Sequence, residues 1–285
     1  MTAGARFRKL IDARGFVCAP GVCDVLSAKI LTDLGFNALY LGGNALGLAH
    51  AKAQPFVTLT ETTEVIGRIS RVTDAALVVD AGAGFGEPSH IAQAVREIER
   101  AGAAALHIDD QPFPKSVNYH RGRGELVSAQ AMAARLKIAR NVLHGDTMLI
   151  ARTDALRVSK SIDDVIARGK AYLSAGADML LVLDAAPATM SKLRSALPDA
   201  KIAWIGGVAP PVPSSQALKD AGFSLALYPF NTVAAMAGAV RDVWGEFAQT
   251  GEVNASADFL ARMRAETLNI VDMQDYWDIE DAQDE

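Results

Sequence analysis

The same short pattern recurs four times along the chain: a helical segment ends, a glycine follows, then two or three small or polar residues and an apolar run. A glycine that ends a helix in the left-handed conformation turns the chain directly into the next element, because only glycine adopts that conformation cheaply. Apolar runs without polar alternation indicate strands covered on both faces, as in a parallel sheet. The four copies are DLGFNALYL (33–41), RAGAAALHI (100–108), SAGADMLLV (174–182) and DAGFSLALY (220–228).

Further apolar runs bring the number of predicted strands to eight, with helical segments between them. In one segment Ile91, Val95 and Ile98 recur at helical spacing, and in another Ser161 stands as an N-cap before the apolar face. Eight strand–helix units in about 230 residues predict an α/β fold, a (β/α)8 TIM-type barrel, with an open doubly wound sheet as the alternative. The predicted strands are Phe16–Ala19, Ala38–Leu41, Ala76–Asp80, Ala104–Ile108, Thr147–Ala151, Met179–Leu183, Lys201–Ile205 and Ser224–Tyr228.

The chain shows no linker rich in proline, glycine or serine, so residues 1–285 are predicted to form one barrel domain. From about residue 251 it is predicted to continue as a C-terminal helical extension. This extension ends in the acidic DIEDAQDE, which is typical of a solvated end rather than a binding element.

Charge and composition exclude several classes of partner. The net charge of -5 and the lack of a long basic run argue against a nucleic-acid surface. The apolar stretches are shorter than the roughly 20 residues that span a bilayer, and the first residues lack the apolar core of a signal peptide. Cys18 and Cys23 are the only cysteines, and their spacing around a Pro-Gly predicts neither a disulfide nor a zinc site. A reducing cytoplasm is the predicted compartment.

Polar side chains gather at the carboxyl ends of four predicted strands, where a barrel of this type places its active site. Asp80 and Asp109 with Arg152 indicate a divalent cation that holds an anionic substrate, since hard oxygen ligands suit Mg²⁺ or Mn²⁺ and arginine grips a carboxylate with two parallel bonds. In the alternative interpretation, these acids cap helices or pair with Arg and Lys. The strand-end segments are Tyr40-Leu41-Gly42-Gly43-Asn44, Asp80, His107-Ile108-Asp109-Asp110-Gln111 and Arg152-Thr153-Asp154.

The stretch LVVDAGAGFGEP (77–88) allows three interpretations: a phosphate-binding loop, a plain turn, or the floor of a metal site. A phosphate-binding loop needs a Lys-Ser or Lys-Thr after its glycines, and none follows here. Pro88 instead stands at the start of the next helix. The metal-site interpretation is therefore the one that remains.

Five segments together resemble the isocitrate lyase/phosphoenolpyruvate mutase superfamily over almost the whole chain, with its short bacterial 2-methylisocitrate lyases and carboxyphosphonoenolpyruvate mutases nearest in appearance. The resemblance implies a Mg²⁺-dependent barrel enzyme that forms or breaks a C–C or C–P bond of a 2-oxo or 2-hydroxy carboxylate next to a metal-held enolate. It also implies a homotetramer, a dimer of dimers that exchange a C-terminal helix. The segments are PGVCDVLSAKILTDLGFNALYLGG, VVDAGAGFG, LHIDDQ..PK, IARTDA and ALYPFNTVAAM.

The resemblance also suggests roles for the polar residues named above. Asp80 and Asp109 are the predicted metal ligands. The predicted substrate-binding residues are Tyr40, Gly42, Gly43, Asn44, His107 and Arg152. The predicted catalytic residues are Asp109, Lys115, Tyr119 and His120, the last three on a glycine-flanked loop from Lys115 to Gly124 that could close over the site.

The chain departs from the family pattern at several polar positions. The second Asp of the metal loop is Gly82, the Glu of Ile-Glu-Asp-Gln is Asp109, and the lyases' acid–base Cys is Val117, which cannot transfer a proton. Tyr119 and His120 are the nearest replacements, and a weaker, substrate-dependent metal site is expected. Three other departures are Gln54 for an Asp, Leu183 (beside Asp184) for a Glu, and Ile205 or a neighbouring Gly for an Asn.

Three functions remain open on this basis. The leading hypothesis is a Mg-dependent lyase that cleaves a C–C bond of a small 2-hydroxy or 2-oxo acid through a metal-held enolate. The second is a 2-oxo acid decarboxylase or hydrolase of the oxaloacetate type, or a C–P mutase or hydrolase, which needs no cysteine. The third is a barrel that binds a metabolite without turnover.

Overall fold

The computed structural model describes residues 1–253 and 255–283, with every side chain in these ranges except that of His120. The chain divides into two compact units, Met1–Val233 and Ala234–Glu285. The first unit is the barrel and carries all of the predicted site residues.

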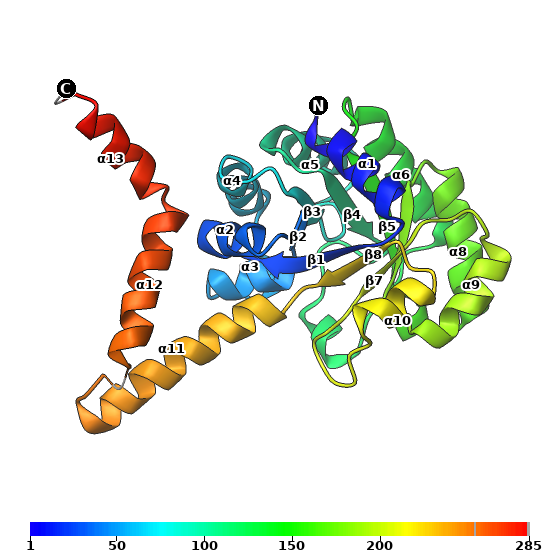
Figure 1. Ribbon diagram of the computed structural model, residues 1–285. Helices are drawn as coiled ribbons and strands as arrows, with labels where there is room; N and C mark the ends of the chain where they lie inside the picture. Colours follow the sequence, from blue (N-terminus) through cyan, green and yellow to red (C-terminus); the bar gives the residue numbers. More distant parts are fainter. Residues whose placement is uncertain (254, 284–285) are drawn as a thin grey trace. The chain divides into compact units, whose positions relative to one another are not determined.

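The first unit is a closed barrel of eight parallel strands in sequence order, β1 to β8, with β1 pairing β8 (Figure 1). This confirms the predicted (β/α)8 architecture and excludes the open doubly wound sheet. The strands are β1 (Val17–Val22), β2 (Ala38–Leu41), β3 (Ala76–Asp80), β4 (Ala105–Asp109), β5 (Met148–Thr153), β6 (Met179–Val182), β7 (Ile202–Ile205) and β8 (Leu225–Tyr228).

Strand β1 differs from its prediction, because it continues through Pro20 and Gly21 to Val22. Proline and glycine normally mark the end of a strand pattern. Here the backbone of β8 approaches so closely that a Cβ on Gly21 would lie 2.6 Å from the Tyr228 carbonyl oxygen. Glycine therefore allows close packing of β1 against β8 at the carboxyl end of the barrel.

Helices follow the strands and cover the outside of the barrel. In α5, Ile91, Val95 and Ile98 are fully buried as predicted, and Gly102 ends the helix in the left-handed conformation at φ 112°. The helices of this unit are α1 (Ala3–Arg14), α2 (Val25–Asp33), α3 (Gly43–Ala49), α4 (Leu59–Ile69), α5 (Pro88–Ala101), α6 (Ala129–Val142), α7 (Ala155–Val158), α8 (Ile162–Ser174), α9 (Met190–Ala196) and α10 (Ser215–Asp220), with short 3-10 turns η1 (Gln54–Phe56), η2 (Val117–Arg121) and η3 (Pro187–Thr189).

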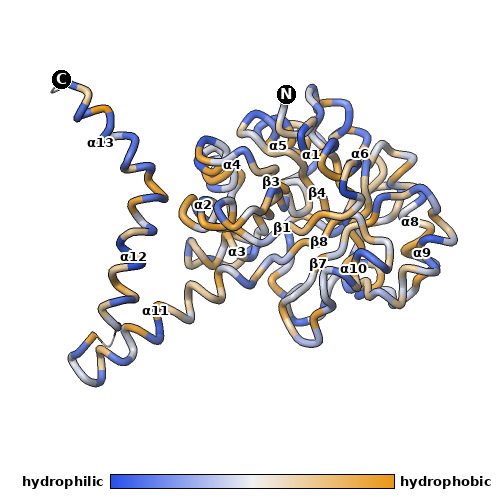
Figure 2. Tube along the Cα trace, viewed as in Figure 1, coloured by the Kyte–Doolittle hydropathy of each residue, from blue (hydrophilic) through white to orange (hydrophobic). Residues whose placement is uncertain are grey.

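Successive strand residues belong to two different cores, since side chains alternate across a strand. Leu39 and Leu41 of β2 pack with the surrounding helices, whereas Ala38 and Tyr40 belong to the core inside the barrel. Phe7 of α1 is part of the inner core. Figure 2 shows both apolar and polar residues along the neighbouring helix α4, whose buried residues include Val65, Ile66 and Ile69. Each strand thus directs its inward side chains, polar at the carboxyl end, into the barrel.

The second unit consists of helices, as the predicted C-terminal segment requires. Helix α11 (Asn231–Thr250) crosses the boundary between the units, and α12 (Ala257–Ile270) and α13 (Met273–Asp281) follow. The boundary therefore lies upstream of residue 251. Among the helices of residues 1–253 and 255–283, none combines the length and apolar character needed to cross a bilayer.

Asp178, just before β6, joins three parts of the barrel. Arg8 of α1 donates to both of its carboxylate oxygens at 2.9 and 3.0 Å, the Leu149 N–H donates at 2.8 Å, and Arg140 of α6 completes the contacts. Burial favours a higher pKa for Asp178, but these bonds and charges outweigh it, so its pKa lies below the usual value.

Asp178→Ala is therefore expected to lower the free energy of unfolding by about 1–3 kcal/mol at pH 7. Because the folded-state pKa is lowered, this contribution is fully present above the unfolded value near about 3.9 and is lost as pH falls through the folded value. Denaturant unfolding at pH 7 and near pH 3 measures both effects. Asp12→Ala, which removes an exposed ion pair with Lys201 (3.2 Å), is the control and should change stability by less than about 1 kcal/mol. A difference that grows toward acid pH would contradict this assignment.

Candidate active site

Four neighbouring strands bring their last inward-facing side chains together at the carboxyl end of the barrel. Strand pairing places Asp80 of β3 beside His107 of β4, and Asp109 of β4 beside Arg152 of β5. Tyr40 of β2 lies next to this group, with its hydroxyl 2.9 Å from His107 Nε2. All five residues are at most 7% exposed. The carboxyl end of the barrel thus brings together two aspartates, a histidine, an arginine and a phenol. This group is called the polar layer below.

The Asp80 carboxylate accepts three N–H bonds. The Gly43 N–H and the Gln54 side-chain amide each donate to Oδ2 at 3.1 Å, and the Gly82 N–H donates to Oδ1 at 2.8 Å. Burial favours a higher pKa for Asp80, but the charges of nearby basic groups and the Gly82 bond outweigh it and hold the pKa well below its usual range. Asp80 is therefore an ionised carboxylate that is almost completely buried.

His107 bridges the groups around it through both ring nitrogens. Nδ1 lies 2.9 Å from Asp109 Oδ1, and Nε2 lies 2.9 Å from the Tyr40 hydroxyl and 3.8 Å from Asp80 Oδ1. Asp109 itself also faces Lys115 Nζ at 3.4 Å and Arg152 Nη1 at 3.5 Å. The imidazole therefore orients Asp109 and Tyr40, and neither ring nitrogen is without a partner.

Asp80, His107 and Asp109 offer ligand atoms that lie within 4.8 Å of one another, which is compatible with one metal ion. Their donor set fits a hard divalent cation in part: the two carboxylates supply the oxygens that Mg²⁺ or Mn²⁺ prefers. His107 is not suited to direct coordination, because both of its nitrogens are already engaged by Asp109 and Tyr40. The carboxylates are the residues that can hold a cation, and the imidazole supports them.

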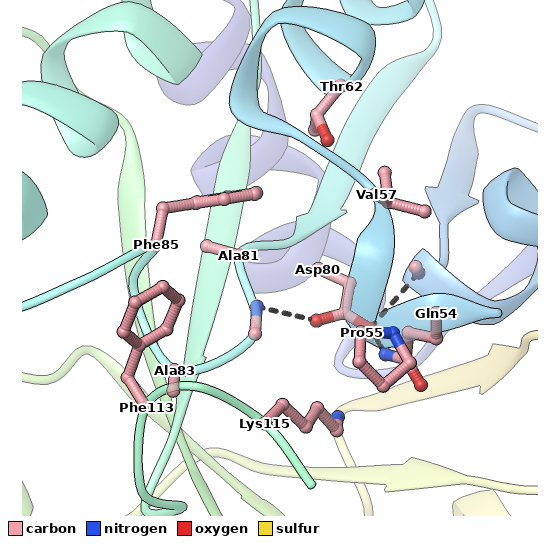
Figure 3. A pocket seen from close by; sticks show the side chains of 12 residues that line it. Gln54, Pro55, Val57, Thr62, Asp80, Ala81, Ala83, Phe85, Phe113 and Lys115 are labelled. Atoms are coloured by element: carbon pink, nitrogen blue, oxygen red, sulfur yellow. Dashed lines mark hydrogen bonds between the residues drawn. The ribbon is translucent and has the colours of Figure 1, made fainter. Parts of the chain in front are cut away.

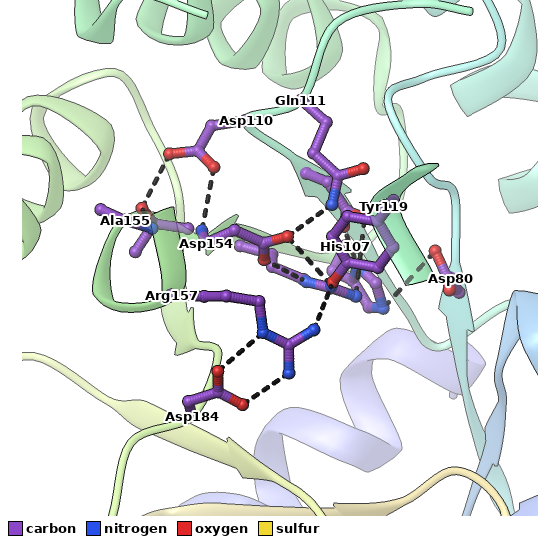
Figure 4. Close-up of polar contacts among 12 residues, drawn as sticks. Asp80, His107, Asp110, Gln111, Tyr119, Asp154, Ala155, Arg157 and Asp184 are labelled. Carbon is purple, nitrogen blue, oxygen red and sulfur yellow. Dashed lines mark hydrogen bonds and ion pairs between the residues drawn. The ribbon is translucent and has the colours of Figure 1, made fainter. Parts of the chain in front are cut away.

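Arg152 is buried among acids and a phenol. Figure 4 shows two of its partners, Tyr119 and Asp154. Its Nε and Nη2 bind the two oxygens of Asp154 at 2.9 and 3.3 Å, and Nη2 also donates to the Tyr119 hydroxyl at 2.6 Å. Burial favours a lower pKa for Arg152, but Asp109 and Asp154 outweigh it and raise the pKa above its usual value. The fork of Arg152 therefore grips Asp154, and its remaining nitrogen faces Asp109.

The loop from Lys115 to Gly124 contributes two side chains to this region. Lys115 Nζ lies 4.6 Å from the centre of the Tyr119 ring, and Tyr119 accepts hydrogen bonds from Arg152 and, at 3.4 Å, from Arg157. Burial raises the pKa of Tyr119 further than the nearby arginines lower it, so the phenol stays protonated. Val117 is 54% exposed. The side chain of His120, also predicted to be catalytic, lies outside the part of the chain that the structure describes.

A cavity of about 600 Å³ opens above the polar layer. Seven of the predicted residues line it: Tyr40, Gly42, Gly43, Asn44, Asp80, Tyr119 and Arg152. Asp80, Gly43 and Gln54 also border a smaller cavity of about 60 Å³, which Lys115 lines together with apolar side chains such as Phe85 and Phe113 (Figure 3). His107 and Asp109 are fully buried behind the walls of these cavities.

The structure adds cavity residues that the sequence analysis did not predict as site residues. Gln54 bonds Asp80, and the ion pair of Arg157 with Asp184 and the ring of Trp204 line the larger cavity. Arg157 and Asp184 carry one detectable signal, because both follow predicted strands: Asp184 comes directly after Leu183, and Arg157 comes six residues after Ala151. Their pairing across different loops has no signature in the sequence.

Comparison with known proteins agrees with this architecture. The family profile described as "Phosphoenolpyruvate phosphomutase" matches residues 7–248. The chain is 33% identical over 250 residues to 2,3-dimethylmalate lyase of Eubacterium barkeri, covering 86% of each protein. It is 36% identical over 252 residues to "Probable 2-methylisocitrate lyase 2" of Corynebacterium glutamicum, covering 86% of this chain and 80% of the other.

Among solved structures, the phosphoenolpyruvate phosphomutase of Streptomyces platensis subsp. rosaceus superposes with a TM-score of 0.90 at 26% identity, over 99% of each chain. The match thus extends over nearly the full length of the chain. The family profile covers most of the chain, and the curated relatives exceed 30% identity over more than two thirds of their lengths. The chain therefore belongs to the phosphoenolpyruvate mutase/isocitrate lyase superfamily and is an enzyme of that lyase type.

Proposed function

We propose that this protein is a Mg²⁺- or Mn²⁺-dependent lyase that cleaves a C–C bond of a small 2-hydroxy or 2-oxo carboxylic acid through an enolate. One observation carries the proposal. An ionised, buried Asp80 and the cationic Arg152 line the same cavity at the carboxyl end of the barrel. A carboxylate that attracts a metal cation and a guanidinium that attracts a substrate carboxylate are the two features that a small anionic substrate requires.

Asp80, with Asp109 behind it, would hold a divalent cation, which when bound would supply a Lewis acid for the 2-oxygen of the substrate. Arg152 and the Gly43–Asn44 backbone face the cavity where the substrate carboxylate would bind. For a 2-hydroxy acid, the hydroxyl proton passes to water in the cavity, the O–H electron pair forms the C2 carbonyl, and the C2–C3 bond breaks. The bonding pair stays on C3 as an enolate, which then takes a proton.

Tyr119 is the best-placed proton donor for that last step. Its hydroxyl accepts N–H bonds from Arg152 and Arg157 and lines the cavity. These two cations stabilise the phenolate that forms when the proton leaves, although burial keeps the resting phenol neutral.

Tyr119→Phe is accordingly expected to lower kcat by about 10²-fold, the usual scale for losing a general acid. Steady-state kinetics separates this role from a structural one. Loss of proton transfer lowers kcat with little change in KM, whereas loss of a brace for Arg152 raises KM. Val117→Cys on the exposed start of η2 is the matched change in the same loop and should not raise activity. Unchanged kinetics in Tyr119→Phe would move the donor elsewhere, and His120→Ala tests the other predicted candidate.

Gly82→Asp tests the metal assignment in the opposite direction. The backbone of Gly82 has φ +52°, and a Cβ at this position would meet nothing within 4 Å. Asp tolerates this left-handed conformation better than most residues, so the change adds a carboxylate near Asp80 at modest strain. We expect the Mg²⁺ dissociation constant to fall by about tenfold, the lower end of the range for outer groups at metal sites. Isothermal titration with Mg²⁺ measures it, with Gly82→Asn as the uncharged control. Equal affinity in all three proteins would contradict a cation at Asp80.

A second function is favoured by Val117, which is exposed and has no transferable proton where the lyases have a cysteine. A 2-oxo acid decarboxylase or hydrolase of the oxaloacetate type, or a C–P mutase or hydrolase, uses the same cation and Arg152 without a cysteine. Decarboxylation needs an electron sink and a late proton, which the polar layer supplies.

One experiment distinguishes these reactions. The purified protein is incubated with Mg²⁺ and a panel of 2-oxo and 2-hydroxy di- and tricarboxylates, and proton NMR follows the products. A 2-oxo acid plus a shortened carboxylate indicates C–C cleavage, CO₂ loss indicates decarboxylation, and no turnover in any member indicates a binding protein. EDTA should abolish either reaction.

The proposal also covers the oligomeric state, the cellular location and the domain organisation. We propose a homotetramer, a dimer of dimers that exchange the C-terminal helices, and a cytoplasmic location for a single barrel domain with a helical extension. Size-exclusion chromatography with light scattering, on the full chain and on one ending at Thr250, tests the assembly.

A further inference from the structure

The large cavity has two chemically different sides. One side carries the acids, bases and backbone groups described above. The other is formed by residues that end or follow β6, β7 and β8, and its side chains are mainly apolar. They include Leu183, Trp204, Ile205, Val208, Pro213 and Phe230. The proposed function uses none of them, so their role is open.

Trp204 is a fixed part of this apolar side. Its ring packs edge-on against Tyr228 with centroids 5.3 Å apart, and it is only 5% exposed. The backbone of Gly206 lies close to the indole, since a Cβ there would come within 2.3 Å of Trp204 Cζ2. An indole held from two sides presents a rigid apolar face, which orders a ligand at low entropic cost.

The charged residues near this side neutralise one another. Arg157 binds Asp184 through two parallel bonds, both 2.7 Å long, from Nε and Nη2. Its remaining nitrogen lies 3.4 Å from the Tyr119 hydroxyl. This pair leaves no net charge for a second carboxylate, so the geometry favours an uncharged group beyond the reacting carbon.

The size of the cavity points the same way. About 600 Å³ lies within the range of roughly 300–1,000 Å³ typical of small-molecule sites, so a substrate larger than a small diacid fits in it. Apolar walls with a small number of polar groups are the usual composition of a site that buries most of a larger ligand.

We propose that the substrate carries an extended apolar substituent, alkyl or aryl, that packs against Trp204, Leu183 and Ile205 while its carboxylate end faces Asp80 and Arg152. This inference rests on the proposed function and specifies its substrate class. A substituent that fills the apolar side buries its surface, and each methylene added to such a pocket changes kcat/KM by about tenfold or more.

A series of malates bearing hydrogen, methyl, isobutyl or benzyl at carbon 3 tests this, with release of the 2-oxo acid product as readout. We expect kcat/KM to rise along the series, and a carboxymethyl member of similar length to isobutyl to be poor. Trp204→Ala should lower kcat/KM for the benzyl member by about 10²-fold and for malate by less than about threefold, and Trp204→Phe should recover most of the loss. Leu183→Ala is the smaller truncation if Trp204→Ala fails to fold. A preference for malate or for the carboxymethyl member, or equal losses on all substrates, would overturn the proposal.

A binding measurement separates this inference from the proposed reaction. The variant Trp244→Phe, Trp277→Phe leaves Trp204 as the single tryptophan of the three in the chain. In the presence of Mg²⁺, benzylmalonate should quench or shift its emission and bind at least tenfold more tightly than malonate. If benzylmalonate binds in this way but no malate is cleaved, the apolar subsite stands and the lyase reaction fails. If malates are cleaved but both malonates bind equally, the subsite fails and the reaction stands.

Discussion

Asp80→Asn is expected to reduce kcat/KM by about 10³-fold or more while leaving the barrel folded. The Lewis-acid contribution of a metal is worth several kcal/mol, and each 1.36 kcal/mol corresponds to about a factor of ten in rate. The neutral amide removes the charge that attracts the cation. Its NH₂ group also faces N–H donors, because Gly43, Gln54 and Gly82 all donate to the carboxylate.

Two measurements distinguish loss of the metal from loss of the fold. Thermal unfolding followed by circular dichroism should still show a cooperative transition, while isothermal titration should show Mg²⁺ binding weakened by at least tenfold. Glu87→Gln changes an exposed acid in the same connection between β3 and α5 and should leave both activity and affinity unchanged. Full turnover in Asp80→Asn, with unaltered metal dependence, would remove Asp80 from the mechanism.

Arg152→Lys is expected to raise KM and to lower kcat/KM by about 10²-fold. Lysine keeps the charge but has one compact ammonium in place of a planar fork. It cannot bind both oxygens of Asp154 and also reach the Tyr119 hydroxyl, which Arg152 does with Nε and Nη2. The cation at this position therefore loses its fixed place at the cavity wall, so it orients a substrate carboxylate less well even though the charge remains.

Arg152→Met separates charge from geometry. It leaves the fully buried Asp109 and Asp154 short of their main cationic partner, so we expect a loss of about 3–5 kcal/mol in the free energy of unfolding. Arg100→Lys on the exposed surface of α5 is the matched control for the conservative change. Near wild-type KM and kcat in Arg152→Lys would show that Arg152 acts only in stability.

The repeated helix–glycine–strand pattern was sufficient to predict the barrel, because each part of it is a local requirement. A left-handed glycine such as Gly102 ends a helix wherever it stands, and an unbroken apolar run such as that of β3 must be covered on both faces. The position of Asp80, Asp109 and Arg152 at the carboxyl ends of strands follows from the same reading. Even so, the continuation of β1 through Pro20 and Gly21 depended on the approach of β8, which no local pattern encodes.

The use of each polar side chain was decided only by the tertiary structure. The sequence indicated that Arg152 would meet a carboxylate, and the fold shows that its fork already holds Asp154. It also indicated His107 as a substrate-binding residue, whereas both of its nitrogens are engaged and it lies behind the cavity wall. The pairing of Arg157 with Asp184 and the placing of Trp204 against Gly206 join residues from different loops. Such contacts depend on the stagger of the strands in the closed barrel, which determines which strand ends and loops face one another. Local patterns in the amino-acid sequence do not encode this stagger.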